Sequence, residues 1–274
     1  MTNNPEKAHA RCCASPAGAQ TTPGDTVRLS ATRPATENAY PAAVARDEFE
    51  EQIRELRIRE KRHTHEADAI AAARRRLPMV EVPADTPLTG PAGTVPLLDA
   101  FAGRSQLISY YMMWHPGCPA AEQCEGCTWN NSQMSELSYL HARDITYAVF
   151  SQGPYAESAK YHEFMGWSMP LYSAADSLGT LLEGRTQGMM HLVCYVRRGD
   201  RIFETYWTTL RGVEAVDTNF RLMDLTVWGR QGAWEDSPDG WPQYDHDGLT
   251  RIDGRPTAQW QRLRAGFDDA LSVS

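Results

Sequence analysis

Several features that mark common protein classes are missing from this sequence of 274 residues. It has no apolar run approaching the roughly 18 residues that a membrane-spanning helix requires, and its first 26 residues lack the apolar core of a secretory signal. It contains no Gly-rich nucleotide fingerprint, no P-loop, no nucleophile elbow and no HExxH motif. These absences predict a cytoplasmic protein that does not contact a membrane, and they exclude the common nucleotide-binding and hydrolase motifs.

Positive charge is also scarce. The chain has 27 Lys and Arg against 35 Asp and Glu, which gives a formal net charge of -8. Such a balance does not predict the basic surface that proteins use to bind the phosphates of nucleic acid. The one basic run, Arg74 to Arg76, lies at the end of an expected helix, where cations interact favourably with the helix dipole. We therefore expect a small-molecule substrate and no nucleic-acid partner.

Composition divides the chain into four segments. Residues 1–45 are rich in Ala, Pro, Thr and Asn without periodicity, which predicts an irregular or disordered tail. Residues 46–78 are predicted to form a long helix, and residues 79–230 an α/β domain. Residues 231–274 are rich in turn formers and predict a C-terminal wrap around that domain. Three tryptophans of this wrap are expected to be buried: Trp234, Trp241 and Trp260.

A weak heptad pattern runs through residues 47–76, where apolar residues recur at alternating steps of four and three. Its positions are Phe49, Ile53, Leu56, Glu60, His63, Ala67 and Ile70, of which Glu60 and His63 interrupt the apolar seam. A helix of this length spans roughly 45 Å. The pattern favours a helix that lies across the domain or joins two subunits in a homodimer.

The order of elements in the domain indicates its fold. Apolar runs at 105–114 and 145–152 predict two buried strands with a helix between them, residues 191–209 predict a hairpin around Gly199, and residues 213–229 predict a closing helix. This order predicts a thioredoxin-like α/β core, a central mixed sheet flanked by helices. In that fold the reactive cysteines lie between the first core strand and its helix.

A CxxC motif occupies that junction. Of the six cysteines, Cys118, Cys124 and Cys127 lie in the loop that follows strand 105–114. Cys124 and Cys127 can form a thiol–disulfide pair whose thiolate is favoured by the start of a helix. They can equally serve as two metal ligands. The CxxC alone does not decide between these interpretations.

The neighbouring residues favour a metal. His115 directly follows the strand and can complete a three-ligand site with Cys124 and Cys127, which leaves an open position of the kind found in catalytic sites. Four methionines flank this site: Met112, Met113, Met189 and Met190. Thioether sulfur favours Cu(I), so copper is the expected metal, with zinc and iron as the other candidates.

Two further residues are secondary ligand candidates. Cys118 lies in a turn bounded by Pro and Gly and is either a third thiolate, a resolving cysteine or a bystander. His191 begins the strand after a long loop, where a thioredoxin-like fold brings a residue against the cysteines. Cys194, in the middle of that strand, is expected to be inert core.

Long motifs in the same order carry a family resemblance. They include "ARRRLPMVEV", "GRSQLISYYMMWH", "QCEGCTW", "FMGWSMPLYS" and "RRGDRIFETYWTTLRGVE". Over about residues 47–243 the chain resembles the bacterial thioredoxin-like family catalogued as domain of unknown function 899. The resemblance implies a thioredoxin-like fold, and the family pattern falls on His115, Cys124 and Cys127. Cys118 and His191 lie outside that pattern.

Three functions are consistent with these residues. The first is a copper-dependent oxidoreductase that oxidises a small thiol or thio-acid with dioxygen, in a pocket formed by Tyr110, Trp114 and Trp129. The second is a metal-free thiol–disulfide oxidoreductase with Cys124 as nucleophile and Cys127 as its partner. The third is a copper or zinc carrier or sensor without chemistry of its own. Replacement of His115 discriminates the first two, since only a metal site requires its imidazole.

Overall fold

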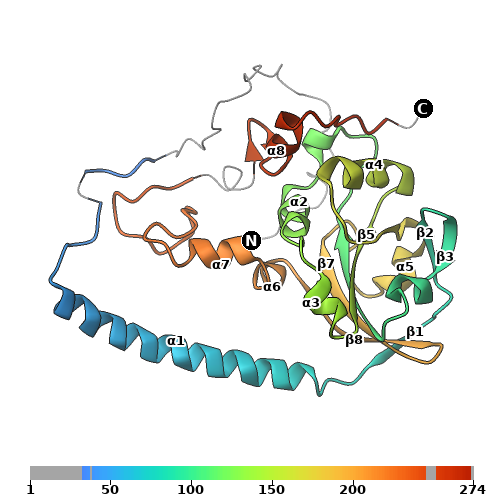
Figure 1. Cartoon of the computed structure of the whole chain (residues 1–274), viewed down its shortest axis with the longest axis horizontal. Coiled ribbons are helices and arrows are strands. Elements are labelled where there is room, and N and C mark those ends of the chain that lie inside the picture. The colour runs from blue at the N-terminus through green and yellow to red at the C-terminus, as the bar shows by residue number, and fades with distance from the viewer. Residues whose placement is uncertain (1–32, 38, 245–250, 273–274) are drawn as a thin grey trace.

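The computed structural model describes residues 33–37, 39–244 and 251–272 of the chain (Figure 1). Most of the tail predicted at 1–45 therefore lies outside the described residues. None of the described helices is both long enough and apolar enough to cross a membrane.

A mixed sheet forms the centre of the molecule, with the strand order β1-β8-β7-β4-β5-β6-β2-β3. Its strands are β1 (Val80–Val82), β2 (Pro87–Gly90), β3 (Gly93–Pro96), β4 (Gln106–Met112), β5 (Ile145–Ser151), β6 (Leu171–Ser173), β7 (His191–Arg198) and β8 (Arg201–Thr209). Strands β4, β5 and β6 are parallel, whereas β7 is antiparallel to β4 and β8 is antiparallel to β7. This arrangement confirms the predicted thioredoxin-like core.

Helices cover both faces of this sheet (Figure 1). Helix α1 (Arg46–Arg74) projects away from the sheet. The other helices are α2 (Glu125–Ser132), α3 (Ser138–His141), α4 (Tyr155–Met165), α5 (Leu178–Leu181), α6 (Arg211–Glu214), α7 (Thr218–Met223) and α8 (Gln259–Arg264), with short 3-10 segments at η3 (Leu97–Phe101), η4 (Ala120–Glu122) and η5 (Ala175–Ser177). The closing helix predicted at 213–229 is divided into α6 and α7. The division occurs because Asp217 adopts an extended conformation before α7 begins.

Strand β4 separates two apolar clusters. Successive side chains of a strand point to opposite faces of the sheet. Leu107 and Tyr111 therefore pack with η3 and α5 on one face. Tyr110 and Met112 pack with α2 and α4 on the other face, in the cluster that also contains both cysteines of the CxxC motif. The candidate site thus lies on the α2 face of the sheet.

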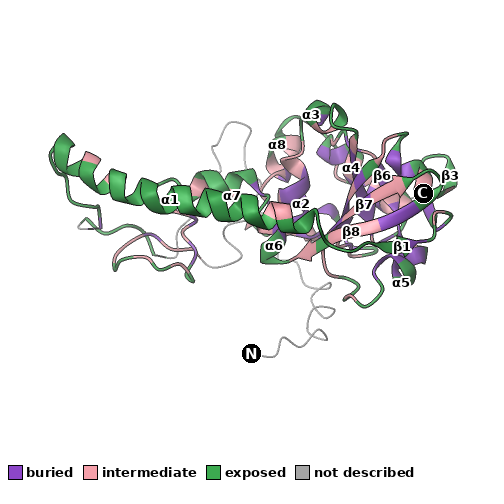
Figure 2. Cartoon of the chain, turned by 90° about the horizontal axis from the view of Figure 1, so that it is seen from below, coloured by how far each residue is buried: buried purple, intermediate pink, exposed green. Residues whose placement is uncertain are grey.

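Helix α1 confirms the long N-terminal helix predicted from the heptad pattern, although it ends at Arg74 rather than at residue 78. None of its residues is buried, and Figure 2 shows that it is exposed along its length. Its far end contacts the sheet through the Arg74 guanidinium, which lies 4.8 Å from the ring centroid of Tyr206 on β8. Pairing of α1 with a second subunit stays a prediction.

The C-terminal residues contain β9 (Arg251–Ile252), β10 (Arg255–Pro256) and α8. Trp241 and Trp260 are partly buried, and the Trp260 indole N–H donates to the Ile252 carbonyl oxygen at 3.0 Å. The expectation that Trp234 is buried is wrong, because 52% of this residue is exposed. Its ring instead lies beneath the Arg211 guanidinium, 4.5 Å from the ring centroid.

The close packing of Gly153 against the Trp114 ring leads to a prediction about stability. Gly153 follows β5, and a Cβ added there would lie 1.9 Å from Cδ1 of Trp114, which follows β4. Gly153→Ala should therefore lower the free energy of unfolding by about 1–3 kcal/mol, because the indole ring must move. Urea unfolding measures this change. Gly179→Ala in α5 is the control, since its Cβ would meet nothing within 4 Å. Equal stability of the two variants would contradict the packing described here.

Candidate active site

The CxxC motif lies at the start of α2, after the loop that follows β4. Cys124 is the N-cap residue of α2, and its Sγ accepts a hydrogen bond from the backbone N–H of Cys127 at 3.4 Å. The first N–H groups of a helix have no partner within the helix, so an N-cap side chain stabilises the helix by accepting one of them. The sulfur of Cys124 is thereby fixed at the positive end of α2.

A buried amide holds the loop before this helix. The side chain of Gln123 is fully buried, and its Nε2 donates to the carbonyl oxygens of His115 and Cys118, each at 3.0 Å. The backbone N–H of His115 in turn donates to Gln123 Oε1 at 3.1 Å. One side chain at the end of the loop therefore satisfies three backbone groups from the first part of the loop. Gln123 was not among the residues predicted from the sequence, although its position next to Cys124 in the "QCEGC" motif offered a signal.

The C-terminal residues also hold the cysteine loop through hydrogen bonds. The Arg251 guanidinium donates to the Gln123 carbonyl oxygen at 2.8 Å and to the Ala121 carbonyl oxygen at 2.7 Å. It also pairs with the Glu125 carboxylate, with Nη2 at 3.0 Å from Oε2. Gln259 is fully buried and donates from Nε2 to the Ala120 carbonyl oxygen at 2.7 Å. Residues more than 120 positions apart in the chain thus position the cysteine loop.

The pKa values of the two thiols are shifted in opposite directions. The pKa of Cys124 is lowered, chiefly by a hydrogen bond from the Cys127 side chain and further by the N–H groups at the start of α2, while burial and the Glu125 charge oppose this change. The pKa of Cys127 is raised well above its usual value, first by burial and then by its contact with Cys124. Cys124 is therefore the thiol that ionises first.

Two neighbours of Cys127 partly offset the effect of burial on its pKa. The Tyr110 side chain hydrogen-bonds its sulfur, and the backbone N–H of Met113 donates to the same Sγ at 3.3 Å. The Cys124 thiol also lies 3.6 Å from Sδ of Met113. The three sulfurs of Met113, Cys124 and Cys127 consequently form one cluster on the α2 face of the sheet.

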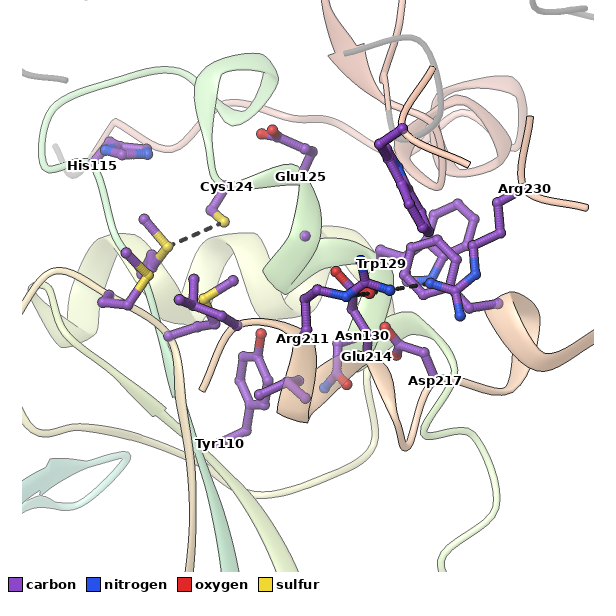
Figure 3. A pocket seen from close by; sticks show the side chains of 18 residues that line it. Tyr110, His115, Cys124, Glu125, Trp129, Asn130, Arg211, Glu214, Asp217 and Arg230 are labelled. Carbon is purple, nitrogen blue, oxygen red and sulfur yellow. Dashed lines mark hydrogen bonds and ion pairs between the residues drawn. The ribbon is translucent and has the colours of Figure 1, made fainter. Parts of the chain in front are cut away.

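A cavity of about 680 Å³ opens from Cys124 (Figure 3). Its sulfur-rich end contains Cys124, Met113, Met189 and Met190, and His115 also lines it. The predicted aromatic residues Tyr110 and Trp129 line the cavity, whereas the Trp114 indole N–H donates to Glu157 Oε2 at 3.0 Å and Trp114 is not among the lining residues. Cys127 lies behind Cys124 and is fully buried.

The other end of the cavity is aromatic and charged, as Figure 3 shows. The rings of Trp129 and Phe220 stack with centroids 5.0 Å apart, and the Arg230 guanidinium lies 4.4 Å from the centroid of Phe220. Asp217 lies among these residues with only 4% of its surface exposed. Burial raises the pKa of Asp217 to about 6, against a lowering by the hydrogen bond from Gln133. No sequence pattern pointed to Asp217.

The predicted metal ligands are only partly brought together. Cys124 and Cys127 are adjacent and His115 lines the same cavity, but the described residues contain no group of three or more His, Cys, Asp or Glu side chains gathered to hold a metal ion. The set formed by His115, Cys124 and Cys127 stays a prediction. Cys118 is disulfide-bonded and therefore does not offer a third thiol.

His191 does not join the site. It is paired with Tyr111 of β4, and paired residues of neighbouring strands share a face of the sheet. Val193 and Tyr195, which alternate with it on β7, pack in the cluster opposite the cysteines. The His191 Nε2 contacts the Thr186 carbonyl oxygen at 2.9 Å. The expectation that this strand start reaches the cysteines is wrong because the register places the imidazole on the far face.

Cys194, which was expected to be an inert core residue, is only partly buried. It is a free cysteine in the middle of β7. Burial raises its pKa to about 11, so it carries almost no thiolate near neutral pH.

Comparison with solved structures finds distant similarities. A mutant of peroxiredoxin Q from Xanthomonas campestris has 13% sequence identity and a TM-score of 0.36, and the match covers 54% of this chain and 97% of that chain. Peroxidoxin BcpB from Mycobacterium tuberculosis has 18% identity and a TM-score of 0.34, with 51% of this chain and 97% of that chain covered. None of the curated proteins compared with the chain matches it.

The family comparison is far more extensive. The model of a family described as "Bacterial protein of unknown function (DUF899)" matches residues 39–253, which include the central sheet, the CxxC loop and all the residues that line the cavity. The match confirms the resemblance inferred from the sequence motifs. The chain belongs to the DUF899 family.

Proposed function

We propose that this protein is a thiol-dependent oxidoreductase in which Cys124 is the nucleophile and Cys127 is the resolving thiol. The observation that carries this proposal is the opposed acidity of two adjacent thiols, one of which lines a cavity while the other is buried behind it. A nucleophilic thiolate needs a lowered pKa and access to substrate. A resolving thiol needs proximity to the nucleophile, and Cys127 hydrogen-bonds the Cys124 sulfur.

The reaction is a thiol–disulfide exchange in two steps. The Cys124 thiolate attacks one sulfur of a substrate disulfide, a Cys124–substrate disulfide forms, and the other half of the substrate leaves as a thiolate that takes up a proton. Cys127 then loses its proton and attacks the Cys124 sulfur, which releases the second half as a thiol. The substrate disulfide is reduced to two thiols, and the cysteine pair is oxidised to a disulfide.

Neighbouring residues support each step. The N–H groups at the start of α2 stabilise the Cys124 thiolate. The contacts of Cys127 with Tyr110 and Met113 stabilise its sulfur when it ionises in the second step. Arg251 pairs with Glu125 and offsets part of the charge that opposes ionisation of Cys124.

The assignment of the two roles predicts different outcomes for two serine variants. Cys124→Ser should lose disulfide reduction, by a factor of 10³ or more on the scale of a missing nucleophile. Cys127→Ser should still react once and should accumulate a mixed disulfide on Cys124, because nothing resolves it. Reaction with a chromogenic aromatic disulfide followed by intact-protein mass spectrometry measures both. Cys194→Ser is the control and should behave as wild type. A stable mixed disulfide on Cys127 would reverse the assignment.

The electrostatic role of Arg251 predicts a shift in thiol reactivity. Alkylation of Cys124 by iodoacetamide should increase as the pH rises through its lowered pKa, since only the thiolate reacts. In Arg251→Gln the midpoint should move to higher pH, because the Glu125 charge loses its partner. Peptide mass spectrometry at a series of pH values measures the rate at Cys124.

The matched control for this prediction is Arg264→Gln in the same C-terminal segment. Arg264 is an exposed residue of α8, and none of the described hydrogen bonds or ion pairs joins it to the cysteine loop. This control should leave the alkylation profile unchanged. Identical profiles for wild type and Arg251→Gln would show that Arg251 does not act on the thiol.

A second candidate function is copper-dependent oxidation of a small thiol or thio-acid. The observation that favours it is the cluster formed by Met113, Cys124 and Cys127, with Met189 and Met190 at the same end of the cavity. Thiolate and thioether sulfurs suit Cu(I), so the donor set fits this metal. Bound copper would supply one-electron chemistry and affinity for sulfur. In that case His115, Met113 and the thiolates of Cys124 and Cys127 would hold the ion, and the cavity would orient the substrate and exclude water.

Metal content tests this candidate. Protein purified without a metal-binding tag should contain close to one copper per chain by plasma mass spectrometry if the candidate is correct. Cys124→Ser, Met113→Leu and His115→Ala should then lose most of it, whereas Met134→Leu, outside the residues that line the cavity, should retain it. A wild-type protein that stays free of metal after anaerobic loading with Cu(I) or Zn(II) would eliminate both this enzyme and a metal carrier, while leaving the thiol exchange untouched.

A further inference from the structure

A buried hydrogen-bond acceptor without a partner lies in the cavity. Asn130 on α2 is 1% exposed, and its Nδ2 donates to the Tyr147 hydroxyl at 3.2 Å. Its Oδ1 has no hydrogen-bond partner among the described residues, although Asn130 lines the cavity. A buried acceptor without a partner is unfavourable by about 1–3 kcal/mol. A ligand that donates a hydrogen bond here would remove this penalty.

A carboxylate lies at the same end of the cavity (Figure 3). Asp217 accepts a hydrogen bond from Gln133 Nε2 at 2.9 Å, and its side chain does not cap the helix that follows. The described ion pairs do not include Asp217. Gln133, which donates to Asp217, also donates its backbone N–H to the Asn130 carbonyl oxygen at 3.2 Å, so Asp217 lies beside the last turn of α2, which carries Asn130.

The cations near Asp217 are already paired. Arg230 forms two hydrogen bonds with the Asp224 carboxylate, at 2.8 and 2.9 Å, and one with Glu214 at 3.1 Å. Arg211 lies 3.6 Å from the same Glu214 carboxylate. Arg211 and Arg230 thus pair with Glu214 and Asp224, whereas Asp217 has no ion pair of its own among the described residues, although the Arg230 charge also acts on it. A buried carboxylate of this kind attracts an ammonium group.

The two ends of the cavity therefore carry different chemical groups, which together favour a ligand with a sulfur at one end and a hydrogen-bond donor at the other. One end presents Cys124 and three methionine sulfurs, and the other presents the acceptors of Asn130 and Asp217. We propose that the cavity selects small aminothiols and their disulfides, with the sulfur at Cys124 and the ammonium group hydrogen-bonded to Asn130 and Asp217. This inference rests on the proposed thiol exchange. In that exchange one aminothiol disulfide and the reduced cysteine pair give two aminothiols and the Cys124–Cys127 disulfide.

Binding of unreactive ligands tests the selectivity without the redox chemistry. The probe is 2-(methylthio)ethylamine, and its matched control is 2-(methylthio)ethanol, which lacks the charge. Tryptophan fluorescence reports binding because Trp129 lines the cavity. The wild type should bind the amine at least about tenfold more tightly, the ratio expected for one charge-assisted hydrogen bond. Equal affinity for the two compounds would overturn the proposal.

Two independent variants locate the selectivity. Asp217→Asn keeps the shape and the acceptor for Gln133 but removes the charge, and Asn130→Leu removes the unpartnered acceptor. Each should reduce the preference for the amine several-fold, whereas Asp176→Asn, an exposed residue of η5 across the sheet, should not. If the folded variants of Asp217 and Asn130 keep the full preference, the amine is bound elsewhere and the proposal fails.

Kinetics with cystamine and with bis(2-hydroxyethyl) disulfide separate this inference from the proposed function. A higher kcat/KM for cystamine that disappears in Asp217→Asn supports both. Reduction of both disulfides at equal rates, dependent on Cys124, retains the thiol exchange and overturns the selectivity. Preferential binding of the amine with no disulfide reduction at all retains the amine site and overturns the thiol exchange.

Discussion

The buried amide of Gln123 determines the geometry on which the candidate site depends. The chain must leave β4, reverse direction and enter α2, and the intervening backbone groups cannot all pair within a regular element. Gln123 satisfies groups of His115 and Cys118 at once, so the loop closes and Cys124 falls at the first turn of the helix. A buried polar side chain is favourable only when its hydrogen bonds are made, and this requirement favours the observed conformation of the loop.

The same junction explains why two identical side chains differ chemically. Cys124 accepts the N–H of Cys127 and faces the cavity, whereas Cys127 lies one helical turn further on and is enclosed by the sheet. Burial raises the free energy of a charged thiolate, and hydrogen-bond donors lower it. The three-residue spacing of the motif therefore gives one reactive and one protected sulfur.

Local features of the site could be predicted from the sequence, because adjacent residues generate them. Strand β4, the CxxC loop and the start of α2 follow from an apolar run and a motif within about 20 residues. Arg251 and Asp217 could not be predicted, since their roles arise from contacts with residues more than 80 positions away. The error on His191 has the same origin, because a shift of one residue in strand register reverses the face that a side chain occupies.

Helix α1 has a different relation to the rest of the molecule. Its 29 residues bury nothing, so their folding gains little from the apolar clusters that stabilise the sheet. Its backbone amides should therefore exchange with solvent through local opening events that leave the cysteine loop intact. Opening of the helix should therefore leave unchanged the packing that determines the acidity of Cys124.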